Sequence, residues 1–225
     1  SDVYKRQLMS TYDVLLQLAD RSVYYLLSED VFPSHGLPYN TMEVINISQN
    51  NRTLTPIEVG ELIIREFVRS SNEQPRTLSL ISSSGWKSFQ KHFDKFLDFL
   101  QYELQNGRHD AKAYLGKSRQ YVAVELTNPD VDSWSIEQEP SSIDLGQLIA
   151  GLTFWSTQTP LFHPNRGEEA MAALYALHNA SRWLKSGHVI VKNGVGSAEK
   201  NFKYTGVSLF FPMRGTQYSF PKLHE

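Results

Sequence analysis

Thr77-Leu78-Ser79-Leu80-Ile81 alternates briefly between polar and apolar residues, and Ser82-Ser83-Ser84-Gly85 follows it directly. Such alternation is typical of a strand. A serine in front of an apolar stripe at helical spacing is a preferred N-cap, although amides at a helix N-terminus can also cradle an anion. We therefore predict a strand that runs straight into a long helix. The stripe of that helix is Trp86, Phe89, Phe93, Phe96, Leu97, Leu100 and Leu104.

The alternation of strands and helices extends upstream of this stretch. Apolar residues at helical spacing predict a helix over residues 10–20, and Val23 to Leu27 is an apolar run typical of a strand buried on both faces. Thr55-Pro56-Ile57-Glu58 predicts another helix start, with Thr55 as N-cap and Glu58 returning a hydrogen bond to it. This order of elements indicates an α/β layered domain. The expected buried face of the helix is Leu62, Ile63, Phe67 and Val68.

The pattern is looser beyond about residue 127. Asn128-Pro129 and Glu139-Pro140 predict loops. Gly194-Val195-Gly196-Ser197 predicts a hairpin or loop, because no third glycine opens a helix after it as a dinucleotide-binding motif requires. The remaining predicted elements are helices at Ile143 to Leu152 and Gly167 to Lys185, and strands at Val189 to Lys192 and Val207 to Phe211.

Composition narrows the classes of function. The 225 residues are 40% hydrophobic and include 12 Phe, 11 Tyr and 4 Trp, which is enough for a packed core. A net charge of −2 gives no electrostatic case for a nucleic-acid partner, and no apolar run approaches the roughly 20 residues of a membrane span. The chain has no cysteine, which excludes disulfides, thiolate metal sites and a cysteine nucleophile within it. No His-x-x-x-His pair occurs with an acidic third ligand, and no Asp-x-Asp-x-Asp-Gly loop occurs, so we expect no metal site among these residues. We also expect no cofactor.

The first seven residues, Ser1 to Gln7, differ in character from the rest of the chain. Asp2 to Gln7 resembles one translation frame of a transposon-end adapter used to prepare sequencing libraries. We therefore expect residues 1–7 to be an artefact at the end of a metagenomic gene fragment and leave them out of the fold prediction. Upstream catalytic residues would then be absent from this sequence.

Ser28-Glu29-Asp30 is the acidic cluster that stands immediately after a predicted buried strand. Open α/β sheets bind ligands at the carboxyl ends of their strands. A partly shielded carboxylate at such a place attracts an Arg or Lys side chain through a charge-assisted hydrogen bond. The alternative interpretation is a solvated strand end with ordinary surface acids.

Several motifs together resemble the clostripain family of cysteine peptidases. In that family the nucleophile lies in an Asp-x-Cys-Leu-Met-(Gly/Ser) motif, and Leu8-Met9-Ser10 matches the end of this motif. An acidic Ser-Glu-Glu type loop follows in the family, where this chain has Ser28-Glu29-Asp30. The resemblance covers residues 8–225 and also rests on Val23 to Leu27, Gly36-Leu37-Pro38-Tyr39, Thr55-Pro56-Ile57-Glu58, Ile143-Asp144-Leu145 and Gly206 to Pro212.

The resemblance implies a caspase-like α/β/α peptidase domain, of which residues 8–127 are the downstream half. Residues 128–225 would form a C-terminal α+β subdomain, whose tail ends without a clear terminal element. The family cleaves peptide bonds with a Cys–His dyad, often after a basic residue. Both dyad members would lie upstream of residue 8, so the chain as given is expected to be inert. Ser28, Glu29 and Asp30 are the candidate substrate-binding residues, with Asp30 in the pocket for the basic residue.

The resemblance further implies a peptide or protein substrate and export from a bacterium to the periplasm, surface or medium. The oligomeric state is left open. One alternative is a catalytically dead caspase-like module that binds peptides, in which Gln7 truly replaces the nucleophile. Another is an unrelated α/β hydrolase that uses Ser82-Ser83-Ser84, although the Gly-x-Ser-x-Gly elbow of such enzymes is absent.

Overall fold

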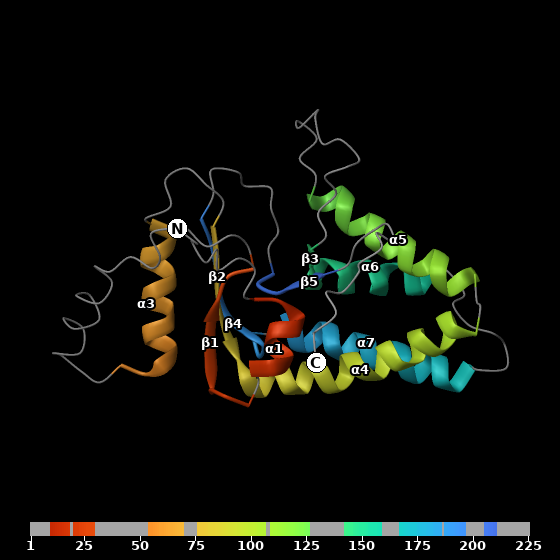
Figure 1. Ribbon diagram of the computed structural model, residues 1–225, viewed down its shortest axis with the longest axis horizontal. Helices are drawn as coiled ribbons and strands as arrows, with labels where there is room; N and C mark the ends of the chain where they lie inside the picture. The colour runs from red at the N-terminus through yellow and green to blue at the C-terminus, as the bar shows by residue number, and fades with distance from the viewer. Residues whose placement is uncertain are drawn as a thin grey trace, which may run out of the picture.

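The computed structural model describes residues 10–18, 20–29, 54–69, 76–106, 109–126, 142–158, 167–185, 187–196 and 205–210 (Figure 1). The mixed α/β class that the sequence predicts is confirmed, with helices predominating. In chain order the elements are α1 (Tyr12–Leu18), β1 (Tyr24–Leu27), α3 (Pro56–Arg69), β2 (Arg76–Ser82), α4 (Ser83–Gln105), α5 (His109–Leu126), β3 (Ser142–Asp144), α6 (Leu145–Gln158), α7 (Gly167–Lys185), β4 (Ile190–Gly196) and β5 (Ser208–Phe210).

Two small sheets organise the described residues. The larger has the order β1-β2-β4, and both of its pairings are antiparallel, with Leu26 opposite Leu80 and Leu80 opposite Lys192. The smaller pairs β3 with β5, also antiparallel, with Ile143 opposite Leu209. In Figure 1, α3 covers one face of the larger sheet, whereas α1, α4 and α7 lie on the other.

The strand β1 differs from its prediction. Its four residues are only half-buried, and Val23 lies before the strand with 69% of its surface exposed. Within the described residues β1 pairs with β2 alone, so it has a neighbour along one edge. An apolar run therefore did not indicate burial on both faces here.

The helix α3 begins as its sequence predicts. The Thr55 hydroxyl accepts from the Glu58 amide at 3.3 Å, and Glu58 Oε2 accepts from the Thr55 amide at 2.8 Å, so the capping box is confirmed. The helix buries Ile64 and Phe67 against Leu78 and Leu80 of β2 in a small separate core.

The glycines Gly194 and Gly196 correct a prediction. They lie inside β4 and pair with β2, where the sequence predicted a hairpin or loop. A Cβ on Gly194 would come within 2.3 Å of Ile64 Cγ2. Gly194 therefore lets α3 lie close against the strand, a role that short-range sequence rules do not distinguish from a turn.

The main core is built on α4. Ser82 is its N-cap and accepts from the Gly85 amide at 3.3 Å, so the capping interpretation of the serines is confirmed. Trp86, Phe89, Phe93 and Phe96 are all at most 1% exposed. They pack with residues of α1, α5, α6 and α7 in one apolar cluster that extends to Val207.

Two features of the downstream half were not anticipated. The sequence patterns did not predict α5, whose inward face mixes apolar Ala111 and Tyr114 with the buried polar Ser118 and Arg119. A strand, Ser142–Asp144, also precedes α6, where the sequence predicted that a helix would begin at Ile143. Residues on both sides of the predicted boundary at 127/128 share the main core, and the boundary itself stays a prediction. No helix among the described residues is long and apolar enough to cross a membrane.

Candidate functional site

The residues Ser28 and Glu29 continue directly from β1, and both are 4% exposed. Thr77, at the start of β2, holds them in place: its hydroxyl oxygen lies 3.1 Å from Ser28 Oγ and accepts from the Glu29 amide at 3.2 Å. The antiparallel pairing of β1 with β2 brings these residues together. Asp30 lies outside the described residues.

The Glu29 side chain turns inward and meets a segment far along the chain. Its Oε2 accepts a hydrogen bond of 2.7 Å from the backbone amide of Gly206. The carbonyl of Gly206 in turn accepts from the Ser10 hydroxyl. We call Ser10, Ser28, Glu29, Thr77 and Gly206 the buried polar cluster, since each is buried and each is hydrogen-bonded to another member.

The backbone of Ser10 is held from both sides. Its amide donates to the Ser28 carbonyl at 2.8 Å, and its carbonyl accepts from the Ser208 amide at 2.8 Å. With the bond to Gly206 and a longer one of 3.5 Å from the Ser208 hydroxyl to the same carbonyl, four hydrogen bonds hold this residue, which is 0% exposed. Ser10 closes the Leu8-Met9-Ser10 motif, so the motif ends in a rigidly held backbone.

The helix α1 follows this anchored residue and docks on α4. The Tyr12 hydroxyl donates to Asp94 Oδ1 at 3.0 Å, while its ring packs edge-on against Trp86 and Phe93. Burial, and secondarily the Asp94 carboxylate, raises the pKa of the Tyr12 hydroxyl beyond its ordinary range. Tyr12 therefore stays neutral and keeps its donor.

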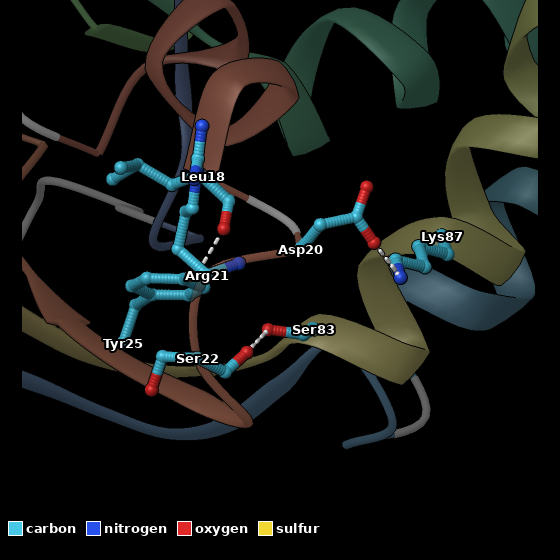
Figure 2. Close-up of polar contacts among 7 residues, drawn as sticks. All are labelled: Leu18, Asp20, Arg21, Ser22, Tyr25, Ser83 and Lys87. Carbon is cyan, nitrogen blue, oxygen red and sulfur yellow. Dashed lines mark hydrogen bonds and ion pairs between the residues drawn. The ribbon is translucent and has the colours of Figure 1, made fainter.

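The turn between α1 and β1 is fastened to the start of α4 (Figure 2). Across the turn, the Tyr25 hydroxyl of β1 donates to the Leu18 carbonyl at the end of α1. The Ser83 hydroxyl donates to the Ser22 carbonyl, and Lys87 pairs with Asp20 at the surface. The hydroxyls of Ser82 and Ser83 thus serve the fold. These contacts give the hydrolase hypothesis for these serines no added support.

A second buried carboxylate, that of Asp144, lies beside the polar cluster. Asp144 is 4% exposed, and its Oδ2 accepts from the Thr205 amide at 2.6 Å. Its Oδ1 accepts from the Thr205 hydroxyl and from the Gln147 amide, both at 2.8 Å, which caps α6. Burial raises the pKa of Asp144, and the hydrogen bonds from Thr205, Gln147 and Gly146 oppose that rise.

The contacts among these described residues hold backbone segments in place, and they form no complete set of catalytic groups. The chain has no cysteine, and within the described residues no group of three acidic or histidine side chains is placed to hold a metal. The fold brings Ser28 and Glu29 into contact with Thr77 and Gly206. No sequence pattern had marked Thr77 or Gly206 as a site residue. Ser10, Asp144 and Gly206 stood in the recognised motifs, yet no spacing rule joined them to Glu29.

The sequence matches the model of the Clostripain family over residues 6–152. No protein with a curated description matches it significantly. Solved structures with a similar arrangement include an inactive zymogen C11 protease from Parabacteroides distasonis, with 10% identity, a TM-score of 0.45, and coverage of 92% of this chain and 50% of that chain.

Two further structures show comparable similarity. A secreted C11 cysteine protease from Bacteroides thetaiotaomicron, in complex with an irreversible peptide inhibitor, has 13% identity and a TM-score of 0.48, with 95% of this chain and 52% of that chain covered. A B. fragilis cysteine protease has 13% identity and a TM-score of 0.45, with 92% and 75% covered. This chain spans about half the length of the first two.

The family match covers more than half of the chain and places it in the class of cysteine peptidases. The chain belongs to the Clostripain family. The resemblance drawn from the sequence motifs is thereby confirmed.

Proposed function

We propose that this chain is the downstream part of a cysteine endopeptidase whose Cys–His dyad lies upstream of residue 8. The observation that carries the proposal is the family match over residues 6–152, together with the absence of cysteine from all 225 residues. A family that cleaves peptides through a thiolate needs a nucleophile that this sequence does not contain. The chain alone is therefore expected to be inert.

The chemistry would follow the usual course of a thiol peptidase. The His polarises the thiol and protonates the leaving amine, while backbone N–H groups beside the Cys hold the oxyanion. Oxyanion donors act only if their positions are fixed before the reaction. The anchoring of Ser10 on both sides of its peptide fits that need, since Ser10 lies three residues after the position of Gln7.

The substrate would be a peptide or protein with a basic residue at the cleavage point. A guanidinium or ammonium in a shielded pocket requires a carboxylate partner. We assign this role to Asp30, next to Ser28 and Glu29, whose side chains are engaged in the buried polar cluster. Export from a bacterial cell is also part of the proposal, and detection of the protein in the culture medium tests it.

The decisive experiment recovers the gene with its upstream sequence and expresses both versions. Hydrolysis is measured on fluorogenic peptides that differ only in Arg, Lys or Asp at the cleavage point, with and without a thiol alkylator. We expect the longer protein to prefer the basic peptides and to be inactivated by the alkylator. The 225-residue chain is the matched control and should show no hydrolysis. Hydrolysis by that control, or a longer protein without Cys, would contradict the proposal.

The second candidate is a peptide-binding module without activity. The observation that favours it is Gln7 at the nucleophile position of the Leu8-Met9-Ser10 motif. Fluorescence anisotropy of a labelled Arg-containing peptide distinguishes the two. Binding by the 225-residue chain, combined with an upstream frame that has no Cys and no His, would establish the module.

A further inference from the structure

The residue Gly206 is a junction between three parts of the chain. Its amide donates to Glu29 after β1, and its carbonyl accepts from Ser10 ahead of α1. Its φ is +110°, and a Cβ there would lie 2.7 Å from Ser79 Oγ on β2. Only glycine fits this conformation and this closeness without strain. The backbone at Gly206 is thus shaped to touch all three segments.

Two buried carboxylates hold consecutive residues at this junction. Asp144 takes the amide and the hydroxyl of Thr205, while Glu29 takes the amide of Gly206. Carboxylates that accept from backbone N–H groups make shorter and stronger bonds than neutral acceptors. The N···O distance is 2.6 Å for Asp144 and Thr205 and 2.7 Å for Glu29 and Gly206.

The held segment then contacts Ser10, the last residue of the Leu8-Met9-Ser10 motif. Gly206 accepts the Ser10 hydroxyl, and two residues on, Ser208 donates its amide to the Ser10 carbonyl. Thr11 also forms a parallel bridge with Ser208. Glu29 and Asp144 thus hold the start of this segment, next to the backbone bond from the Leu145 amide to the Val207 carbonyl and the pairing of β5 with β3.

We propose that Glu29 and Asp144 are positioning residues of the peptidase: they clamp residues 205–206, which fix Ser10 and with it the backbone that follows the nucleophile. The inference rests on the proposed function, because it assigns these carboxylates a role in the same site. Their action is indirect, through Gly206 and Ser208, and needs no contact with substrate.

The first test uses the 225-residue chain and does not depend on activity. Amide hydrogen exchange is compared for the wild type, Glu29→Ala, Glu29→Gln, Asp144→Asn and Tyr114→Phe. Tyr114 is the matched control, since its buried hydroxyl donates to the Leu152 carbonyl on α6, away from Ser10. We expect Glu29→Ala to speed exchange at Gly206 and Ser208 by about tenfold or more, with the amides of α4 unchanged.

Glu29→Gln distinguishes the hydrogen bond to the Gly206 amide from the negative charge of the Glu29 side chain. Gln retains an acceptor oxygen, so Glu29→Gln should restore part of the protection. If Glu29→Ala fails to fold, hydrogen exchange is measured on Glu29→Gln and Asp144→Asn instead. Each should show a smaller local increase in exchange rate than removal of the whole side chain. Unchanged exchange at Gly206 and Ser208, or an increase shared equally by α4 and by Tyr114→Phe, would overturn the clamp.

The second test uses the longer protein with its upstream sequence. A displaced oxyanion donor lowers kcat and leaves KM nearly unchanged, so we expect Glu29→Ala to lose about tenfold or more in kcat. Tyr114→Phe should keep the wild-type kcat. A rise in KM alone, or a kcat equal to that of Tyr114→Phe, would refute the positioning role. If the wild-type protein lacks peptidase activity the proposed function fails, and hydrogen exchange shows separately whether the clamp exists.

Discussion

The aromatic core around α4 and the buried polar cluster lie side by side but are built on opposite principles. The core takes four aromatic residues from one helix, at regular spacing, and packs them through apolar contacts. The polar cluster takes single residues from segments near positions 10, 28, 77 and 206, and each must meet a partner at hydrogen-bond distance. The core therefore supplies bulk stability, whereas the cluster sets the position of the backbone.

The largest effect is expected in the core. Phe93→Ala removes a ring that is 1% exposed and stacks on Phe89 at 5.3 Å, so it leaves a cavity among rigid neighbours. Such truncations cost about 3–5 kcal/mol, a large share of a typical stability of about 5–15 kcal/mol. Urea unfolding followed by tryptophan fluorescence measures the loss.

The control for that variant is Phe154→Ala, which removes the same ring from a position that is 47% exposed. Its cost should stay near about 1 kcal/mol or below, since less apolar surface returns to water and no closed cavity forms. Equal losses for the two variants would show that the α4 stripe is not the centre of the core.

An intermediate effect is expected in the polar cluster. Thr77→Val keeps the shape of the side chain but removes the hydroxyl that contacts Ser28 Oγ and accepts from the Glu29 amide. A buried donor that loses a partner costs about 1–3 kcal/mol. The measurement is again urea unfolding, and hydrogen exchange at the Glu29 amide reports the local change.

The matched control is Thr153→Val in α6, where the hydroxyl donates to the Ile149 carbonyl within its own helix. That carbonyl is already an acceptor in the helix, so the cost should be within about 0.5 kcal/mol. A Thr77→Val variant as stable as this control would argue that the polar cluster tolerates the loss of its hydroxyls.

The smallest effect is expected at the surface end of α4. Lys87 and Asp20 form an ion pair in which both side chains are more than half exposed. Lys87→Ala should cost about 0.2–1 kcal/mol, and added salt should remove the difference by screening. A double-mutant cycle with Asp20→Ala measures the pair. A salt-independent loss above that range would mean that the pair, like the polar cluster, positions the turn between α1 and β1.

Local sequence rules were most successful for features that depend only on residues within one helix and its cap. The capping box of α3, the Ser82 cap and the aromatic stripe of α4 were all predicted, because each needs only residues three or four apart. They did less well at β1, whose half-buried state depends on its neighbours, and at Gly194, whose absent side chain makes room for Ile64. The helix α5 escaped notice because polar residues occupy part of its inward face.

The motifs in the sequence established family membership and the α/β class, since both reside in short patterns and their order along the chain. The assignment of substrate binding to the segment Ser28-Glu29-Asp30 stays a proposal, in which Asp30 contacts the substrate and Glu29 positions the backbone. That Glu29 faces Gly206, 177 residues away, and that Asp144 holds Thr205, 61 residues away, could come only from the folded chain. A hydrogen bond needs its two atoms within about 3 Å, and no periodicity in a sequence encodes which distant segments the packing of helices and sheets will bring that close.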